Sequence, residues 1–453
     1  MRDVRDPDAE RAEADGVLVA AGPPAAEDDD DRTHRPIWLW LTPFLGRPPP
    51  LTRRQWRVLG LVAFATLFDQ YDRAIFALAL PQIQASLAIP ESDVGYLGSI
   101  VRLGSLPALG VALAADRLGR RRVLLWTIAA YTLLTGATAL APDTQTFITL
   151  QFFARIFTTA EVLLAVVVIA EEFDAENRGW GIGALFAIQA CGVGVVAILF
   201  PLVEWLGWGW RALFAFGLVP LVLIAWWRRG MPETPRFEHQ QRQQSEHALA
   251  PVRSLVRDYP GRFAGICVVI LLFAMGGAAA DFLGPKYLQD AHGWTPSNVA
   301  FVYVIGGAFG IVGATFAGWL GDRRGRRPVT VLFGLAVIAL AAAFYNAAGW
   351  VLIPLWVVMI FALIGHDTLL AAFGAEMFPT SYRSTAAGAR AVVATVGAVL
   401  GLALESVLYA IVGSHWTAVT ILLAVAIVAP VVVGLTFPET SRRQLEEIAP
   451  ERG

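Results

Sequence analysis

Twelve long apolar runs dominate this sequence, and they restrict its fold more than any other feature. Each run is close to the roughly 20 residues that an α-helix needs to cross a hydrocarbon core about 30 Å thick. Lipid offers no hydrogen-bonding partners, so only helices and closed barrels satisfy the backbone there, and runs of this length without strand-like alternation are helices. The sequence therefore predicts an all-α membrane protein with these spans: 58–82, 94–115, 123–141, 146–170, 180–203, 211–229, 263–288, 298–320, 328–347, 350–374, 384–412 and 416–437.

The composition agrees with a membrane location and disfavours other classes. Hydrophobic residues make up 56% of the 453 positions and charged residues only 16%, which is outside the usual balance of a soluble protein. A net charge of −2 gives no basic surface for nucleic acid. The sequence also shows no zinc-ligand spacing, phosphate-binding glycine loop or H-E-x-x-H motif. Cys191 and Cys267 both lie in apolar runs, so we expect no disulfide framework, no cofactor and no metal.

A short cationic turn occurs twice in the chain. It begins at Asp116 with the sequence D-R-L-G-R-R-R, and again 206 positions later at Asp322 with D-R-R-G-R-R. The tripeptide Pro-Glu-Thr at 232–234 recurs at 438–440 with the same offset. A third set repeats its internal spacings of seven and five residues: Glu171, Arg178 and Gly183, then Glu376, Arg383 and Gly388. The two parts of the chain are therefore copies of one plan.

These doubled motifs resemble the major facilitator superfamily of secondary transporters, whose loop pattern is G-x-x-x-D-R-x-G-R-R. The second copy matches from Gly318 onward, whereas Ala112 replaces the first glycine of the first copy. The resemblance covers about residues 55–445 and implies twelve transmembrane helices in two six-helix pseudo-symmetric halves. Glu171 with Arg178, and the stretch 232–236, are similar to the charged cytoplasmic elements of sugar and metabolite porters.

The placement of arginines predicts the orientation of the chain. Arginine clusters fall on alternate connections between the apolar runs, and cationic loops stay cytoplasmic during insertion. We therefore expect an inner (plasma) membrane protein with both termini in the cytoplasm. The predicted organisation is a disordered acidic tail at 1–52, a first six-helix half at 53–230, a cytoplasmic linker at 231–261, a second half at 262–440 and a short tail at 441–453.

The N-terminal tail is acidic and proline-rich, a composition that does not bury a core. It lacks the basic start, short apolar stretch and cleavage site of a signal peptide. Within it, residues 37–45 contain two tryptophans and suit either a membrane-surface segment or a loosely packed tail.

Charged residues inside the apolar runs are the candidate functional residues. An ionisable side chain at the bilayer centre costs about 2.5–3.5 kcal/mol, so each one suggests a function by default. The set comprises Asp69, Asp72, Arg73, Arg102, Arg155, Glu161, Asp281, Lys286, His366, Asp367, Arg390 and Glu405.

The first run carries the predicted proton-coupling site. Asp69 and Asp72 are three residues apart on one helical face, and Arg73 lies four residues after Asp69, where it would neutralise that carboxylate. Two neighbouring carboxylates resist ionising together, which favours a proton on Asp72. The D-x-x-D pattern resembles the corresponding region of proton-linked aromatic-acid and metabolite symporters, with Gln70 in place of glycine. The alternative is that Asp69 and Arg73 form a permanent structural pair.

Other polar residues in the runs are predicted to bind substrate. Arginine binds a carboxylate in a bidentate manner and keeps its charge, glutamine suits a hydroxyl group, and a histidine beside an aspartate titrates near neutrality. The predicted substrate-binding set is Arg102, Arg155, Gln189, Asp281, His366, Asp367 and Arg390. The alternatives are pairing of the arginines with Glu161 or Glu171, and a packing role for His366. Gly284 and Pro285 are expected to break their helix just before Lys286, the only lysine.

The charged residues of the doubled motifs are predicted to form a gate. We expect the aspartates to cap a neighbouring helix and to pair with loop arginines in one conformation only. The alternative is that these charges only set the topology. The predicted gating residues are Asp116, Arg117, Arg120, Glu171, Arg178, Asp322, Arg323, Arg326, Glu376 and Arg383.

Taken together, these patterns predict a monomeric secondary active transporter that moves a small organic solute, a carboxylate or related metabolite, by alternating access with proton symport. Its partners would be the solute, protons and the lipid bilayer, without nucleic acid. A proton-coupled exporter is the first alternative, although the 180–203 run lacks the G-x-x-x-G-P-x-x-G-G pattern of such exporters. A sugar transporter and a non-transporting nutrient sensor are further alternatives. An enzyme is not expected, because no nucleophile and base share one depth.

Overall fold

Helices make up the regular structure of this chain. The computed structural model describes residues 48–174, 176–228, 250–379 and 382–441, together with positions 36 and 45, and these residues contain no strand. Nearly all of the predicted N-terminal tail, most of the predicted linker and the end of the C-terminal tail lie outside the described residues.

The helices follow the predicted runs closely. The first part of the chain forms α2 (Arg53–Leu78), α3 (Leu80–Leu87), the 3-10 turn η5 (Glu91–Asp93), α4 (Val94–Leu103), α5 (Ala108–Leu118), α6 (Arg120–Ala139), α7 (Thr144–Glu172), α8 (Arg178–Trp205) and α9 (Trp210–Arg228). The second part forms α11 (Ala250–Asp258), α12 (Pro260–Lys286), the π-helical turn η6 (Tyr287–Ala291), α13 (Pro296–Arg324), α14 (Arg326–Phe344), the 3-10 turn η7 (Gly349–Val351), α15 (Leu352–Glu376), α16 (Arg383–Val412), α17 (His415–Ala426) and α18 (Val428–Thr436).

Nine helical segments of the described chain are long and apolar enough to cross a membrane. Each of them coincides with one of the predicted runs. The three remaining runs correspond to α2, α6 and α9. In α2 the apolar run is interrupted by Asp69, Asp72 and Arg73, so composition by itself does not mark this helix as a membrane span.

Breaks close to prolines divide three of the predicted spans. The first span splits into α2 and α3 at Ala79, two residues before Pro81. The second span splits into α4 and α5 near Pro107, and the last splits into α17 and α18 at Ile427, three residues before Pro430. Proline lacks an N–H group and its ring clashes with the carbonyl group four residues earlier. The predicted break at Gly284 and Pro285 is wrong, because α12 continues through both residues and the irregularity follows as η6.

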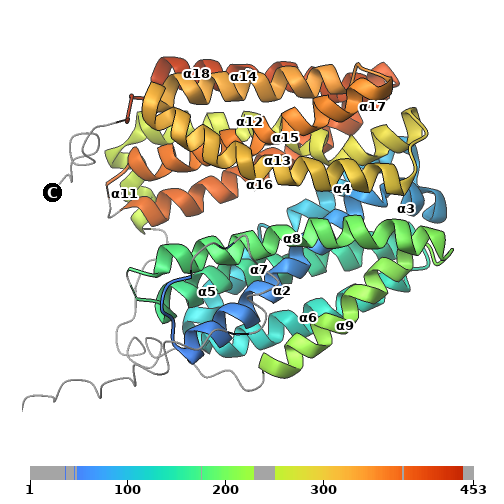
Figure 1. Cartoon of the computed structure of the whole chain (residues 1–453), viewed down its shortest axis with the longest axis horizontal. Coiled ribbons are helices and arrows are strands. Elements are labelled where there is room, and N and C mark those ends of the chain that lie inside the picture. The colour runs from blue at the N-terminus through green and yellow to red at the C-terminus, as the bar shows by residue number, and fades with distance from the viewer. Residues whose placement is uncertain are drawn as a thin grey trace, which may run out of the picture.

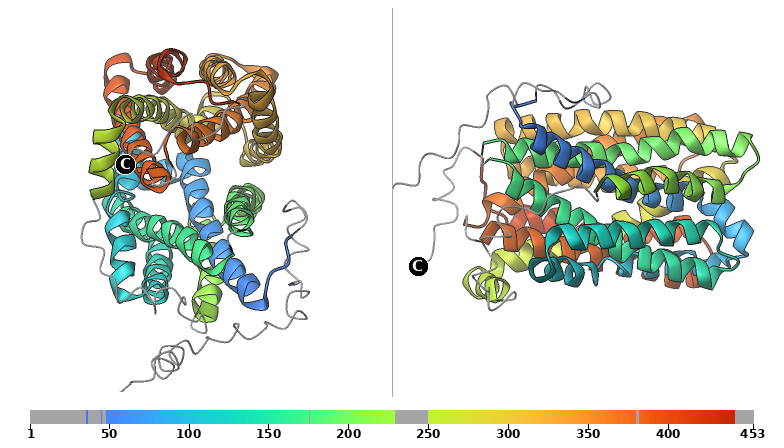
Figure 2. Two further views of the ribbon diagram at one scale, coloured as in Figure 1. Left: turned by 90° about the vertical axis from the view of Figure 1, so that its left-hand side faces the viewer. Right: turned by 90° about the horizontal axis from the view of Figure 1, so that it is seen from below.

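The helices gather in two groups that face each other. Figure 1 shows α2 and α5–α9 on one side and α12–α18 on the other, and the end-on view of Figure 2 shows the same separation. We call α2–α9 the first group and α12–α18 the second group. The groups meet where α4 packs against α16 and α8 packs against α13. Helices from both parts of the chain therefore enclose the centre of the molecule.

The sequence repeat is visible in the local structure. Gly119 and Gly325, 206 positions apart, both interrupt the chain between two helices, with φ/ψ of 95°/129° and 102°/137°. These angles favour glycine because a Cβ atom is strained there. After each glycine an arginine pairs with a carboxylate from the same group: Arg120 with Glu171, and Arg326 with Glu376.

Close packing of α8 against α2 depends on Gly192. A Cβ atom at this position would lie 2.3 Å from the carbonyl oxygen of Leu67 and 2.7 Å from the backbone nitrogen of Tyr71. Neither backbone atom is able to move by itself, so a methyl group would separate the two helices. Gly194, two residues along the same helix, has no atom within 4 Å of such a Cβ.

We therefore expect Gly192→Ala to destabilise the protein while Gly194→Ala does not. Overpacking of this kind costs about 1–3 kcal/mol. Thermal unfolding of the two purified variants in the same detergent would measure the difference. Equal unfolding temperatures for both variants would contradict the packing described here.

Candidate functional site

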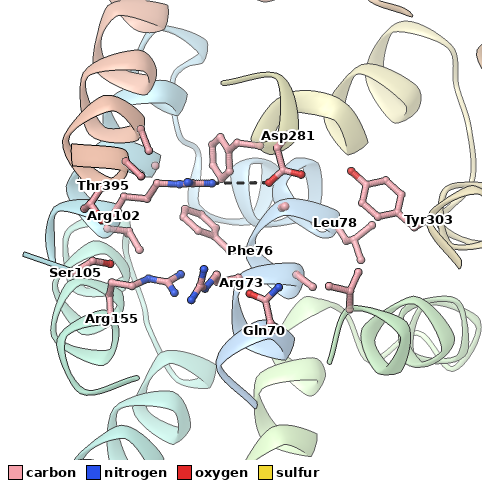
Figure 3. Close-up of a pocket in the computed structure, with 18 residues that line it drawn as sticks. Gln70, Arg73, Phe76, Leu78, Arg102, Ser105, Arg155, Asp281, Tyr303 and Thr395 are labelled. Carbon is pink, nitrogen blue, oxygen red and sulfur yellow. Dashed lines mark ion pairs between the residues drawn. The ribbon is translucent and has the colours of Figure 1, made fainter. Parts of the chain in front are cut away.

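A cavity of about 380 Å³ lies between the two groups of helices. Its walls come from α2, α4, α7 and α8 on one side and from α12, α13 and α16 on the other. The charged side chains that line it are Arg73, Arg102, Arg155 and Asp281 (Figure 3). This volume lies within the range of small-molecule sites, about 300–1,000 Å³.

Asp69 is the centre of a buried polar cluster beside this cavity. Its side chain is only 2% exposed, and it pairs with Arg73 of the same helix and with Arg155 of α7, whose Nη1 lies 3.2 Å from Oδ1. Gln189 of α8 donates a hydrogen bond to Oδ2 at 3.2 Å. The predicted i, i+4 partner Arg73 is therefore present, and Arg155 pairs with Asp69 and not with Glu161 or Glu171. Gln189, predicted to bind substrate, contacts Asp69 in this conformation.

Asp72 is equally buried but has a different environment. Asp72 is 5% exposed, and its Oδ1 has no hydrogen-bond partner among the described residues. Asp72 interacts electrostatically with Arg155 and with Asp69. An unpartnered buried oxygen is costly for a carboxylate and is less costly for a protonated carboxyl group. Asp69 is thus paired with two arginines, whereas Asp72 has an oxygen without a partner among the described residues. The prediction that Asp72 carries the proton rests on this difference.

Arg102 and Asp281 face each other across the cavity. Arg102 belongs to α4 of the first group and Asp281 to α12 of the second, and their nearest charged atoms are 3.9 Å apart (Figure 3). Both side chains are partly accessible from the cavity. An anion entering the cavity would compete with Asp281 for the Arg102 guanidinium, because arginine binds carboxylates through several N–H groups.

Aromatic side chains form another part of the cavity wall. Phe76 of α2, Phe282 of α12 and Tyr303 of α13 line it, and the Tyr303 hydroxyl is buried without a hydrogen-bond partner among the described residues. Trp356 of α15 packs on Tyr303 with ring centroids 4.5 Å apart. The sequence analysis missed these residues, since aromatic residues in apolar runs carry no signal that distinguishes a site from ordinary packing.

The neighbouring residues His366 and Asp367, both predicted to bind substrate, have different environments. His366 is 1% exposed and stacks on Phe273, with ring centroids 4.1 Å apart, whereas the Asp367 side chain is 61% exposed. Nδ1 of His366 lies 4.0 Å from Oδ1 of Asp367. Arg390 of α16 lies against α15, where a Cβ atom at Gly374 would be 1.8 Å from its Nη1. None of these three residues lines the cavity.

The predicted gating residues lie away from the cavity, at the end of the helices where the two doubled arginine turns are found. Arg120 pairs with Glu171, and Arg326 pairs with both Glu376 and Asp322, the latter at 3.1 Å. Arg323 stacks on Trp319 at 4.4 Å, and Arg383 donates to the carbonyl oxygen of Phe378 at 3.4 Å. Arg178 begins α8. The side chains of Asp116 and Arg117 lie outside the described residues.

The cap of α14 comes from Glu439, which the sequence analysis did not assign. Its two carboxylate oxygens accept hydrogen bonds from the backbone N–H groups of Arg326 at 2.9 Å and Arg327 at 3.1 Å. A carboxylate at a helix N-terminus satisfies N–H groups that lack a partner within the helix. Glu439 belongs to the second Pro-Glu-Thr motif. In the second half of the chain this motif therefore caps a helix, the role that was predicted for Asp322.

Comparison with known proteins gives a consistent result. The family model described as Major Facilitator Superfamily matches residues 62–389 and 311–452. The chain is 27% identical to a gallate transporter of Pseudomonas putida, covering 78% of the chain and 85% of the relative, and 25% identical to a benzoate transport protein of Acinetobacter baylyi, covering 78% and 83%. Its fold is similar to the crystal structure of a D-xylose-proton symporter, with a TM-score of 0.72, 17% identity and coverage of 85% and 98%.

The two aspartates of α2 should differ in their importance for stability. Asp69→Asn removes the charge that neutralises Arg73 and Arg155, and breaking a buried ion pair costs about 3–5 kcal/mol. Asp72→Asn removes no hydrogen bond at Oδ1, so we expect a much smaller loss. Thermal unfolding of the purified variants at one pH would check this order, and a larger loss for Asp72→Asn would contradict it.

Proposed function

The chain belongs to the major facilitator superfamily, and from this premise we propose that it is a secondary active transporter that carries a small organic carboxylate by alternating access with proton symport. The family and its transporter relatives make the chain a transporter and not an enzyme. They also make it a multi-pass inner-membrane protein.

We place twelve helical passes in the membrane, in two six-helix halves at 53–230 and 262–440. Nine passes have the length and composition of membrane spans, and α2, α6 and α9 supply the other three. Asp69 of α2 pairs with Arg155 and accepts a hydrogen bond from Gln189 in the interior of the molecule. A charged residue that is paired in the interior is tolerated in a membrane-spanning helix. The end that carries the doubled arginine turns faces the cytoplasm, together with both termini and the 231–261 linker.

The observation that carries the proposal is the group of guanidiniums at the cavity. Arg73, Arg102 and Arg155 all line it, beside the rings of Phe76, Phe282 and Tyr303. Fixed positive charge next to aromatic surface suits a carboxylate attached to a ring. Relatives that are named transporters of gallate and benzoate support this chemistry. The likeness to a xylose symporter concerns the fold alone, so a sugar substrate is the weaker proposal.

The balance of charge around the cavity suggests how a proton and an anion travel together. Arg73, Arg102 and Arg155 interact with Asp69, Asp72 and Asp281 as one electrostatic cluster. Three permanent positive charges then face three carboxyl groups. A proton on Asp72 leaves one positive charge in excess, which a substrate carboxylate neutralises. Loss of that proton restores the balance and weakens binding of the anion, so release of substrate follows release of the proton.

In the transport cycle, the pairs at the cytoplasmic end would stabilise one of the two end states. Arg120 with Glu171 and Arg326 with Glu376 and Asp322 each join elements of one helix group. We propose that Arg178, Arg323 and Arg383, together with Asp116 and Arg117, act in the same gate. Binding energy at these pairs shifts the equilibrium between end states only if the contacts differ between them.

Binding of a carboxylate should be measurable without transport. Benzoate is expected to raise the unfolding temperature of the purified protein, whereas benzamide, a neutral molecule of the same shape, is not. At a ligand concentration of 100 times Kd the stabilisation is about 2.7 kcal/mol.

Arg102→Gln should reduce this stabilisation strongly, and Arg257→Gln, an exposed change on α11 outside the cavity, should leave it unchanged. Equal shifts with benzoate and benzamide would reject recognition of the anion.

Proton coupling should depend on Asp72. In proteoliposomes, Asp72→Asn is expected to exchange labelled benzoate with preloaded benzoate, because the amide resembles the protonated carboxyl group. The same variant should fail to accumulate benzoate under an imposed pH gradient, because it has no proton to release. Gradient-driven accumulation in both Asp69→Asn and Asp72→Asn would place the proton site elsewhere, with Asp281 and then Asp367 the next candidates.

A further inference from the structure

A second cluster of charged side chains joins the two helix groups at the end opposite to α11. In Figure 1 this end holds α3 and the start of α17, on the side of the molecule away from α11 and the C-terminus. Five charged or titratable residues meet there: Glu91 of η5, Lys286 of α12, Asp290 of η6, Glu405 of α16 and His415 of α17. We call these residues the outer cluster. The sequence analysis gave no role to Glu91 or His415.

His415 bridges two carboxylates that belong to different helix groups. Its Nδ1 lies 2.6 Å from Oε1 of Glu405 in the second group, and its Nε2 lies 2.9 Å from Oε2 of Glu91 in the first. A neutral imidazole has only one N–H group, yet both ring nitrogens face an acceptor at hydrogen-bond distance. Both contacts are hydrogen bonds at the same time only when the bridge holds one more proton than a neutral imidazole with two carboxylates.

Glu405 and His415 form the part of the bridge that is shielded from water, whereas Glu91 at its outer end is 46% exposed. Glu405 is fully buried, His415 is 5% exposed, and the imidazole stacks on Tyr409 with ring centroids 4.1 Å apart. Gly95 at the start of α4 allows the groups to approach closely, since a Cβ atom there would lie 2.4 Å from Oε2 of Glu405 and from the carbonyl oxygen of Leu402. An unpaired charge in such a place is costly because no solvent replaces the lost partner.

Lys286 makes a second connection beside the bridge. Its ammonium group lies 2.6 Å from Oε1 of Gln84, 3.2 Å from Glu91 and 2.5 Å from Asp290. Gln289 of η6 accepts a hydrogen bond from the side chain of Gln82 and donates one to the carbonyl oxygen of Leu78. Glu91 thus receives both Lys286 and His415 from the second group. It is the one member of the outer cluster that belongs to the first group, so both of the cluster's ion pairs between the groups depend on it.

We propose that the outer cluster is a proton-binding latch, in which one proton held by the Glu91–His415–Glu405 bridge keeps the outer end of the transporter closed. This inference rests on the proposed alternating-access function and orientation, and it assigns a proton site distinct from Asp69 and Asp72. The other charged groups that face the bridge are Lys286 and Asp290. Tyr409 stacks on the ring, and Tyr345 interacts with Glu405.

The sign of the pH effect follows from the proton count. When the bridge loses its proton, one of its two carboxylates faces a ring nitrogen that has no hydrogen to donate, and the closed state loses a charge-assisted hydrogen bond. The separated groups bind that proton less tightly, because a free imidazole is mostly neutral above about pH 6.5. Lower pH therefore favours the closed outer end. Above that pH the ratio of closed to open molecules should fall by up to about tenfold per pH unit.

The distance across the outer end tests this inference without any substrate. Spin labels would be attached at Gln145→Cys in the first turn of α7 and at Ala348→Cys just before η7, both exposed, with Cys191 and Cys267 replaced by serine. Pulsed electron–electron double resonance in lipid nanodiscs measures the distance between the two labels. The population with the shorter distance should grow as the pH is lowered from about 8 to about 6.

His415→Gln keeps a donor and an acceptor but does not titrate, so the distance distribution should become independent of pH. Glu91→Gln should have the same effect, and it decides the question if His415→Gln fails to fold. Asp93→Asn is the matched control, since Asp93 lies on the same turn and is exposed, and its side chain accepts a hydrogen bond only from Ser92 among the hydrogen bonds described. It should respond to pH as the wild type does.

A pH response that survives both His415→Gln and Glu91→Gln would overturn the latch, as would a wild-type distance that does not respond to pH while benzoate still changes it. An outer distance that stays constant at every pH and with benzoate would instead count against alternating access, and would overturn the latch with it.

Discussion

Neutralisation of the buried Asp69 carboxylate is the constraint on which the centre of this molecule depends. A charge without a partner in the middle of a helical bundle costs several kcal/mol. Asp69 avoids this cost through Arg73 on its own helix, Arg155 on α7 and Gln189 on α8. The interaction therefore fixes how three helices are rotated about one another. Because guanidinium groups stay charged, any rearrangement of these helices must provide each arginine with another anion.

The close packing of backbones makes this arrangement possible. Gly192 brings α8 against α2 one turn after Gln189 on the same helix, which places the Gln189 amide within reach of Asp69. Gly95 has the same effect between α4 and α16 at the other charged cluster. Small residues at helix interfaces allow backbones to approach and polar side chains to meet across helices. Packing and electrostatics therefore depend on each other at both sites.

The central cavity and the outer cluster share one helix. Asp281 lines the cavity opposite Arg102, and Lys286 of the outer cluster follows five residues later on α12. At 1.5 Å per residue the two positions are only about 7.5 Å apart along the helix axis. A shift of α12 that accompanies binding at Asp281 would therefore also move Lys286 relative to Glu91. Such mechanical continuity is a physical route by which an occupied cavity and a closed outer end would influence each other.

The sequence by itself determined the helices, the repeat and the identity of most charged residues in the interior. Run length and hydrophobicity are local properties, so the predicted spans 146–170 and 298–320 agree to within a few residues with α7 (Thr144–Glu172) and α13 (Pro296–Arg324). For the same reason Asp69, Arg155 and Asp281 stood out as charges in apolar runs. Only the tertiary structure decided their partners. Arg155 pairs with a residue 86 positions earlier, and His415 joins Glu91 across 324 positions. Such contacts depend on how helices rotate and pack, and a single sequence does not record that rotation.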